Sequence, residues 1–415
     1  MTQTDNHKVG RAAFGFIFAS TLMSAVSFSI VIPVLPELVR QLAGGDRADA
    51  AEWMMLLVSA WGLTQFVFSS LLGNLSDRYG RRPILLLSTL GLGIDFLFMA
   101  TAPSLILFLV GRLISGATSA SFSTARAYVA DIVPETERTG AFGKLASTLS
   151  LGFIAGPALG GLLSQYDLRL PFLVAAAACL ANFVLGLVVL RESLPAASRR
   201  SDVRWRLLEH GTANTRLFHG QDLRALLGVS FLVSLANMLW SSVWVLFCGY
   251  RFAWSPVEMG VQIMAAGVLG IAVQTWLVTP IVRRLGERRT LYCGLTISAA
   301  SLMYAGVAPN ALWFVASMPI AALGLILGPS LSGLLSAKAG PEHQGKIHGF
   351  AQSLHGLASI VGPPLFGFVF AWSIRQDAAH DLSALAVFIS AGFLIGGLAL
   401  GLVVRDEATQ RIRDQ

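Results

Sequence analysis

Long apolar segments separated by short polar ones run along almost the whole chain. Twelve of them can be placed, over residues 12–38, 52–73, 83–102, 104–130, 140–163, 170–190, 223–248, 257–283, 289–307, 310–336, 346–372 and 382–404. An apolar helix needs about 20 residues to cross a bilayer. A membrane β-barrel would instead show segments of about ten residues with alternating polarity. The pattern therefore predicts an all-α membrane protein with twelve transmembrane helices.

The longest polar segment, Arg191–Asp222, is rich in arginine and separates the first six apolar segments from the last six. We therefore expect an N-terminal six-helix bundle over 1–190, a cytoplasmic basic linker over 191–222 and a C-terminal six-helix bundle over 223–415.

Two short matches relate the halves at a single offset of 206 residues. Gly156-Pro157 corresponds to Gly362-Pro363, and the segment LSDRYGRR (75–82) corresponds to IVRRLGER (281–288), so that Gly80 falls on Gly286. Two parallel halves with the same in–out sense would give this relation. The sequence therefore predicts pseudo-symmetric bundles.

Charge is scarce and unevenly distributed along the chain. Charged residues make up 13% of it and hydrophobic residues 54%, whereas a soluble domain carries about 25% charged residues. With a cytoplasmic N-terminus, 24 of the 30 Lys and Arg residues fall on the cytoplasmic side, five fall outside, and Arg112 lies within a span. The positive-inside rule then predicts that both termini are cytoplasmic. The N-terminus has no cleavable signal pattern, and the net charge of +7 is expected to face anionic lipid rather than nucleic acid.

Four charges and two glycines are concentrated in GNLSDRYGRR (73–82), between the second and third spans. One interpretation is a soluble cap on a helical hairpin, and the other is a moving part of a cytoplasmic gate. Gly80 suits the positive φ of a tight turn. Asp77 ends a helix where the macrodipole favours a cation, so we expect its partner to be an arginine or the N-terminus of another helix. The gate candidates are Gly73, Asp77, Arg78, Gly80, Arg81 and Arg82, with Asp131, Glu135 and Arg138 after the fourth span.

Asp95 is the one carboxylate deep within an apolar span. An ionisable residue at that depth is functional by default. Asp95 and Arg112 lie at the same depth on consecutive antiparallel spans, so we expect them to interact directly or through water. A buried arginine keeps a neighbouring carboxylate ionised, and loss of the contact would favour its protonation. The pair is therefore a candidate for proton coupling, and the alternative is a static ion pair that joins two helices.

Polar residues form stripes at helical spacing on the first, seventh and eleventh spans. Unsatisfied polar groups are costly in lipid, so these stripes are expected to line the bundle interior. One interpretation is a wet central cavity and the other is hydrogen bonding between helices. Trp240 fits either a cavity wall or an interfacial belt. The cavity candidates are Ser24, Gln65, Ser234, Asn237, Trp240, Gln274, Gln352 and His355.

The three cysteines, Cys179, Cys248 and Cys293, lie in or at the ends of apolar spans without paired spacing. The sequence therefore predicts no disulfide framework and no metal site. It also contains no P-loop pattern, which argues against ATP as the energy source.

These segments resemble the major facilitator superfamily. GNLSDRYGRR is similar to the family signature between the second and third helices, and GRLISG (111–116) to its fourth-helix arginine signature. GFIAGPALGG (152–161) is similar to the signature of the drug–proton antiporter branch, carried here by Gly152, Gly156, Pro157, Gly160 and Gly161. The glycines spaced by four make one smooth helix face that permits close packing, and the resemblance implies that this surface bends or slides between states. It also implies that Asp77 contacts the eleventh helix near 345–349.

Within that branch the chain most resembles tetracycline efflux proteins, through IPVLPEL, WGLTQFVFSSLLGNLSDRYGRRPILLLS and SIVGPPLFG. Asp95, Gln65 and Gln274 match polar residues of those proteins. At three positions where they carry Asp, His and Asp, this chain has Ser24, Gly270 and Ser298. These departures weaken the expectation that tetracycline itself is the substrate.

The resemblance implies a non-enzymatic, proton-coupled transporter that exports a small amphipathic organic compound by alternating access. The expected setting is the bacterial inner membrane, with a monomer driven by the proton gradient and without cofactor or nucleic acid. One alternative is a facilitated carrier or proton symporter for a small metabolite. Another is a transport-inactive sensor or scaffold, against which the complete signature turn argues.

Overall fold

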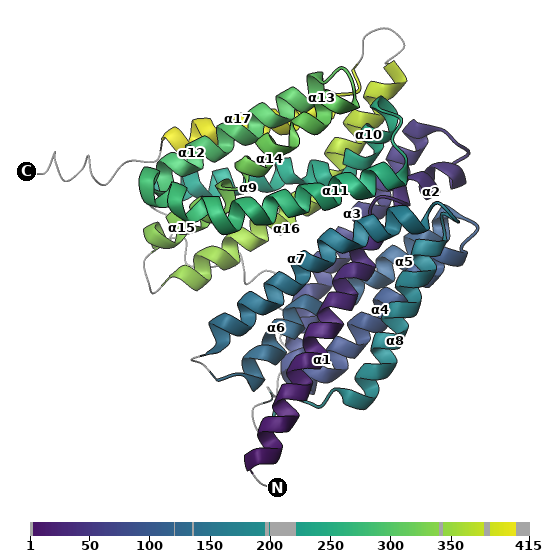
Figure 1. The fold of residues 1–415 in the computed structure, drawn as a ribbon, viewed down its shortest axis with the longest axis vertical. Coiled ribbons are helices and arrows are strands. Elements are labelled where there is room, and N and C mark those ends of the chain that lie inside the picture. The colour runs from purple at the N-terminus through teal and green to yellow at the C-terminus, as the bar shows by residue number, and fades with distance from the viewer. Residues whose placement is uncertain are drawn as a thin grey trace, which may run out of the picture. The chain divides into compact units, whose positions relative to one another are not determined.

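A computed structural model of the chain describes residues 3–119, 121–134, 137–195, 199, 221–339, 343–376 and 382–403. These residues are almost entirely helical (Figure 1), and no strand occurs among them. The chain forms two compact units. The first holds residues 1–207 with 254–267, and the second holds 208–253 with 268–415.

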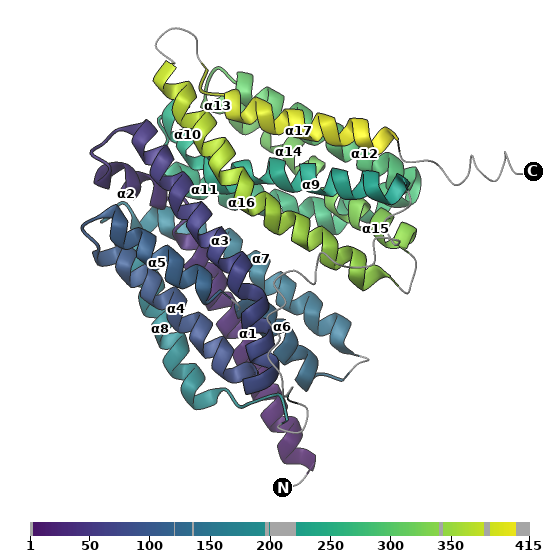
Figure 2. The same ribbon diagram turned by 180° about the vertical axis from the view of Figure 1, so that it is seen from behind.

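The part of the first unit that precedes residue 208 is drawn from purple to teal in Figure 1, and Figure 2 shows it from behind. Within it α1 packs along α7 and α8, α4 packs along α8 and α5, and α3 packs against α5. Its helices are α1 (Gln3–Ile30), α2 (Leu35–Leu42), α3 (Arg47–Tyr79), α4 (Arg81–Thr101), α5 (Leu105–Ala117), α6 (Ser121–Ile132), α7 (Arg138–Leu163) and α8 (Leu170–Val189).

In the second unit α9 packs against α16 and α17, and α12 packs against α14, α15 and α17. The helices of the second half of the chain are α9 (Gln221–Ser242), α10 (Trp244–Arg251), α11 (Pro256–Ala272), the π-helix η4 (Val273–Leu277), α12 (Val278–Val307), α13 (Ala311–Ala316), α14 (Met318–Gly324), α15 (Leu327–Ala339), α16 (Gln344–Gln376) and α17 (Leu385–Leu402).

Ten helical stretches of the described chain are long and apolar enough to cross a membrane. The pair Gly15–Ile30 and Leu35–Leu42, bent by 44°, adds an eleventh. One of the ten, Pro256–Val307, has 52 residues and covers two expected spans. It breaks at Gly286, where φ is 77°. Helix therefore covers most of each of the twelve expected segments. The first is bent at 31–34, and breaks also divide the fourth into α5 and α6, the seventh into α9 and α10, and the tenth into α13, α14 and α15.

The packing repeats between the halves at the offset of 206 residues. Helix α1 corresponds to α9, α4 to α12 and α7 to α16 at this offset, and α8 corresponds to α17, which begins 215 residues after it. The pairs α1–α7, α4–α8 and α1–α8 accordingly recur as α9–α16, α12–α17 and α9–α17. The two turns also share their geometry, because Gly80 has φ 109° and ψ 165° while Gly286 has φ 77° and ψ 161°. The internal repeat predicted from two short matches is thus present in the fold, which has the two related bundles of helices that were expected.

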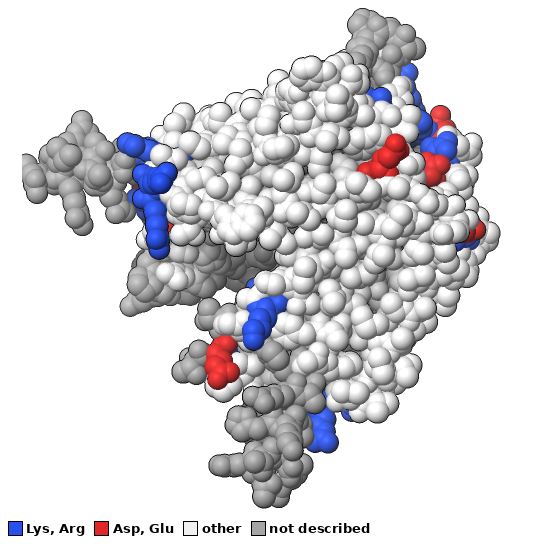
Figure 3. All heavy atoms as spheres, in the orientation of Figure 1, with Lys and Arg blue, Asp and Glu red and all other residues white. Residues whose placement is uncertain are grey.

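Charged side chains gather mostly at helix ends, and the helix flanks on the face drawn in Figure 3 are almost free of them. Large apolar side chains such as Val188 (82% exposed) and Trp276 (72% exposed) lie outward instead. A protein that faces lipid has this distribution, because hydrocarbon solvates apolar side chains and excludes charge.

Candidate functional site

Asp95 on α4 and Arg112 on α5 form a buried ion pair in the first unit. Arg112 Nη2 donates to Asp95 Oδ2, and Arg112 Nε donates to Oδ1 at 3.3 Å. Asp95 is 0% exposed and Arg112 is 8% exposed. Arg112 Nη2 also lies 3.7 Å from the sulfur of Met99. The direct contact expected from equal depth is present, and its role in proton coupling stays a prediction.

The preceding glycine makes this contact possible. A Cβ at Gly111 would lie 2.8 Å from Asp95 Oδ1 and 3.4 Å from Phe98 Cβ. Real Cβ atoms essentially never approach an oxygen so closely. On α5, Arg112 therefore supplies the cation, and Gly111 leaves the space that the Asp95 carboxylate occupies.

The second unit has no charge at the equivalent positions. Asp95 corresponds to Ser301 and Arg112 to Met318 at the offset of 206. Both are buried, and the Ser301 hydroxyl donates to the Ser317 carbonyl at 3.4 Å. Two helices of this fold thus pack at this place without an ion pair.

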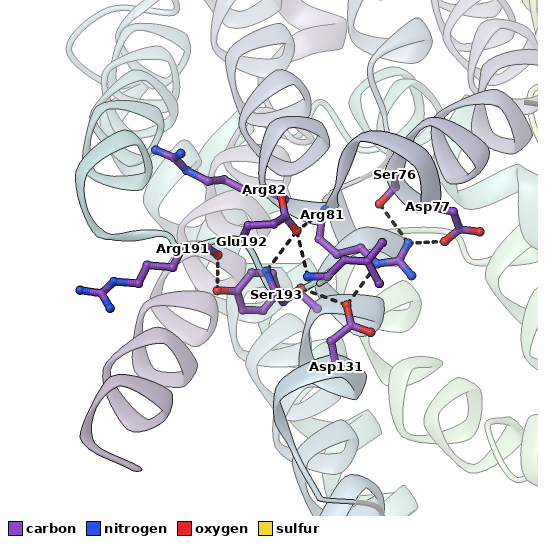
Figure 4. Close-up of polar contacts among 10 residues, drawn as sticks. Ser76, Asp77, Arg81, Arg82, Asp131, Arg191, Glu192 and Ser193 are labelled. Atoms are coloured by element: carbon purple, nitrogen blue, oxygen red, sulfur yellow. Dashed lines mark hydrogen bonds and ion pairs between the residues drawn. The ribbon is translucent and has the colours of Figure 1, made fainter. Parts of the chain in front are cut away.

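The signature turn is held by a network of polar contacts around Arg81 (Figure 4). Its Nη1 donates to Asp77 Oδ1 at 2.5 Å and to Ser76 Oγ at 3.1 Å, while its Nε donates to Asp131 Oδ2 at 3.2 Å. Arg81 thereby joins the end of α3 and the start of α4 to the end of α6. Of the two partners expected for Asp77, the arginine is found. The expected contact with 345–349 would join the two units and stays a prediction.

Glu192, which the sequence interpretation missed, also contacts this turn. Its Oε1 accepts hydrogen bonds from the backbone N–H of Arg81 at 2.7 Å, and its Oε2 from that of Arg82 at 3.2 Å. The neighbouring Ser193 hydroxyl donates to Asp131 Oδ2 at 2.9 Å. A carboxylate directly after the sixth apolar segment was the available signal, but 110 residues separate it from the turn.

The remaining gate candidates take less part in this network of polar contacts, as far as the described residues show. Gly73 is exposed, and a Cβ there would meet open space. The Arg78 guanidinium lies 5.2 Å from the ring centroid of Tyr79. Arg82 Nη2 donates to the Leu187 carbonyl at 2.7 Å, and Arg138 Nε donates to the Val133 carbonyl at 3.3 Å. Glu135 lies outside the described residues.

The glycine face of α7 packs directly against α1. A Cβ at Gly152 would lie 3.0 Å from the backbone nitrogen of Val26, and one at Gly156 would lie 2.9 Å from that of Ile30. The Ser29 hydroxyl, on α1, donates to the Gly152 carbonyl at 2.9 Å. The packing surface expected from glycines spaced by four is therefore present, and its sliding between states stays a prediction.

The other residues of that motif occupy the same part of α7. Gly160 faces Ile30, with a hypothetical Cβ 3.3 Å from the Ile30 Cα. Gly161 faces another segment of the first unit, because its Cβ would lie 2.7 Å from the Pro256 carbonyl oxygen. Pro157 lies inside α7, which continues through it.

The cavity candidates of the first unit are buried or hydrogen-bonded inside it. Ser24 is 3% exposed and lines a small pocket between α1, α4 and α6, together with Ser20 and Thr89. Ser20 Oγ accepts a hydrogen bond from Asn182 Nδ2 on α8 at 2.9 Å. Gln65 Nε2 donates to Ser119 Oγ at 3.0 Å. At Ser20 the alternative of hydrogen bonding between helices therefore holds.

In the second half several candidates are solvent- or lipid-accessible. Asn237 and Trp240 are exposed on successive turns of α9, whereas Ser234 is buried. Trp240 lies against Trp244 with ring centroids 4.0 Å apart. The remaining candidates are Gln274 in η4 and Gln352 and His355 in α16, all three exposed. Their role in binding a substrate stays a prediction.

Comparison with known proteins agrees with this architecture. A model of the Major Facilitator Superfamily matches residues 17–363 and 226–413. The class E tetracycline resistance protein of Escherichia coli is 34% identical over 348 residues, which cover 84% of this chain and 85% of that protein. The class D protein of Salmonella ordonez is 32% identical over 388 residues, covering 94% and 96%.

Solved structures share the fold at low sequence identity. The nucleoside transporter NupG superposes with a TM-score of 0.76 at 14% identity, covering 94% of this chain and 98% of that one. The human organic anion transporter MFSD10 gives a TM-score of 0.66 at 22% identity, covering 94% and 99%. The chain therefore belongs to the Major Facilitator Superfamily, as a non-enzymatic, multi-pass membrane transporter that resembles the tetracycline resistance proteins.

Proposed function

We propose that the protein is a drug/proton antiporter that exports a small amphipathic organic compound by alternating access. The observation that carries this proposal is the buried Asp95–Arg112 pair. Bacterial relatives of nearly the same length are named for resistance to tetracycline and to multiple drugs, including the multidrug resistance protein 2 of Bacillus subtilis at 26% identity over 408 residues. The setting we propose is the bacterial inner membrane, with both termini in the cytoplasm.

Comparison of the two halves supports a coupling role over a static one. A buried ion pair contributes little to stability, and apolar replacements of similar volume are often neutral. Ser301 and Met318 occupy the equivalent place in the second unit without any charge. The fold therefore does not need a carboxylate and a guanidinium at this place. We take their presence in the first unit alone as support for a functional role.

In the proposed cycle Asp95 alternates between two states. With Arg112 in contact, the carboxylate is ionised and its charge is matched. When the helices rearrange and the contact breaks, a buried carboxylate binds a proton instead, because an unpaired charge is costly at that depth. Inward proton movement supplies about 2.3 kcal/mol per charge per 100 mV, in addition to the pH gradient. The proton gradient is then the energy source, and no cofactor is required.

For the substrate we propose a chemical class. The chain has Ser24, Gly270 and Ser298 where tetracycline efflux proteins are charged or titratable, so tetracycline is one test compound among several. In the second unit Ser298 lies against Gly324, whose hypothetical Cβ would be 3.2 Å from Ser298 Cβ. A larger side chain at 298 would need more room there. An amphipathic compound without strict charge requirements fits this set of residues.

The decisive experiment transplants the uncharged pair of the second unit into the first. Asp95→Ser combined with Arg112→Met removes both charges together, whereas Asp95→Asn leaves a buried arginine unmatched. We expect both variants to retain compound binding, measured by ligand-induced thermal shift, and to lose proton-driven efflux in inverted vesicles. The matched control is Glu37→Ser with Arg40→Met, which removes a pair whose side chains are about one third exposed. Full proton-driven exchange by the Asp95 variants would refute the proposal.

The second candidate is a facilitated carrier or proton symporter for a small metabolite. The uncharged residues at 24, 270 and 298 favour it, because they reduce the number of groups that could exchange protons against cargo. An imposed pH gradient separates the candidates. Antiport requires that efflux accelerates when the gradient is applied, a uniporter is indifferent to it, and a symporter moves cargo in the same direction as protons.

A further inference from the structure

The Glu192 carboxylate lies in a nest of four backbone N–H groups. Its Oε1 accepts from Arg81 at 2.7 Å, from Ser193 at 3.0 Å and from Leu194 at 3.1 Å, and its Oε2 accepts from Arg82 at 3.2 Å. Two of these donors belong to the first turn of α4, and two belong to the segment that follows α8. The side chain therefore joins two parts of the chain that are distant in sequence.

The first turn of α4 needs an acceptor supplied by another segment. The leading N–H groups of a helix have no partner within it, and a Ser, Thr, Asp or Asn side chain at the N-cap commonly accepts hydrogen bonds from them. Here the capping position is Gly80, which has no side chain, and no side-chain cap comes from the turn itself. Pro83 has no N–H, so Arg81 and Arg82 present the first free donors. Glu192 supplies the missing cap in trans.

Gly80 also leaves room for this carboxylate. A Cβ there would lie 2.9 Å from Glu192 Oε1 and still closer to its other carboxyl atoms. At the equivalent Gly286, a Cβ would meet nothing within 4 Å. Among the described residues, the turn at Gly286 therefore forms without a carboxylate against its glycine.

The segment that follows α8 also forms hydrogen bonds with the end of α6. The Ser193 hydroxyl donates to Asp131 Oδ2 at 2.9 Å, and Asp131 accepts from Arg81 Nε through the same oxygen. The Tyr128 hydroxyl, one turn earlier on α6, donates to the Arg191 carbonyl at 2.7 Å. Figure 4 shows Glu192 and Ser193 beside Arg81, between the turn and Asp131.

We propose that Glu192 is a positioning residue for Arg81. Its carboxylate fixes the backbone of the first turn of α4, and this holds the Arg81 guanidinium between Asp77 and Asp131. The ends of α3, α4 and α6 then move as one block. This deepens the proposed function, on which its role in the transport cycle rests, because a gate that opens and closes needs rigid parts on each side of the moving contact.

Amide hydrogen exchange on the purified full chain tests the proposal without any substrate. We expect Glu192→Ala to accelerate exchange at the amides of Arg81 and Arg82 by about tenfold or more, as expected for loss of a helix cap. We also expect faster exchange at the end of α6, around Ile132 and Val133. Glu137→Ala is the matched control, because Glu137 precedes α7 without making a side-chain cap. Exchange equal to that of the control would overturn the proposal.

A double-mutant cycle separates positioning from local stabilisation. If Glu192 acts through Arg81, Glu192→Ala adds little to the exchange of α6 amides once Arg81→Gln is present. If the effects of the two changes simply add, Glu192 is only a helix cap and the positioning role is wrong. Should Glu192→Ala fail to fold, Glu192→Gln keeps the size of the side chain and removes its charge, and the same cycle applies. A failure here is distinct from a failure of proton coupling, because neither measurement depends on transport.

Discussion

Gly111 is the residue that lets the Asp95 carboxylate approach Arg112. The two charged residues and their depth can be read from the apolar pattern, since each interrupts a span seven or so residues from its end. The glycine is part of the same short motif, but its contact with a helix sixteen residues earlier is a property of the packed pair α4–α5.

Replacing Gly111 by Ala is expected to displace the carboxylate. A Cβ 2.8 Å from Asp95 Oδ1 must displace the Asp95 carboxylate. Displacing a reacting group from its place lowers rates by roughly tenfold or more. We expect proton-driven transport to fall by that factor while the protein remains folded. Gly140→Ala is the control, because a Cβ there meets nothing within 4 Å. Equal transport by the two variants would show that the pair tolerates movement.

At the scale of elements, the association of α7 with α1 depends on small residues. Apolar side chains gain little by leaving lipid, so helices in membranes associate through close backbone packing and hydrogen bonds. Gly152, Gly156 and Gly160 give α7 a flat face, and the Ser29 hydroxyl bonds across it. The equivalent Gly362 on α16 faces Met238 and Leu235 of α9, with its hypothetical Cβ 2.5 Å from Met238 Cγ.

Gly156→Ala is expected to weaken this packing. The new Cβ would lie 2.9 Å from the backbone nitrogen of Ile30, which cannot move away as a flexible side chain could. Overpacking of this kind costs about 1–3 kcal/mol, and thermal unfolding in detergent should report it as a lower Tm. The control Gly143→Ala, on the same helix with nothing within 4 Å, should be neutral or stabilising, since alanine is the better helix former. An unchanged Tm for Gly156→Ala would contradict the close packing.

At the scale of the whole molecule, the repeat provides an internal control for each feature. Equivalent helices pack alike in the two units, and equivalent turns use a glycine at positive φ. The chemistry added to this common frame differs between the halves: Asp95, Arg112 and Asp131 correspond to the uncharged residues Ser301, Met318 and Ala337. The first unit therefore carries the ionisable groups that we propose to act in transport.

The two turn glycines should respond differently to alanine. Both Gly80→Ala and Gly286→Ala force a side chain into a positive-φ conformation that is almost exclusive to glycine, which costs about 1–3 kcal/mol. Only Gly80→Ala also displaces the Glu192 carboxylate, so it should lower the Tm further. This additional fall in Tm should disappear when Gly80→Ala is combined with Glu192→Ala. The Tm of the double variant should then fall by the effect of Gly286→Ala plus the effect of losing the Glu192 cap. Equal effects of the two glycine changes would mean that the carboxylate moves aside without cost.

The sequence alone determined the class of protein, the apolar spans, the repeat and the depth of Asp95 and Arg112. Those features depend on local composition and on periodic spacing, because lipid selects apolar helices of fixed length. Tertiary structure decided that Asp77 pairs with Arg81 within its unit, and that Ser20, which lines a small pocket, bonds to Asn182 of α8. It alone placed Glu192 at the signature turn. Contacts across 110 residues depend on how helix ends meet in three dimensions, and no local pattern encodes that.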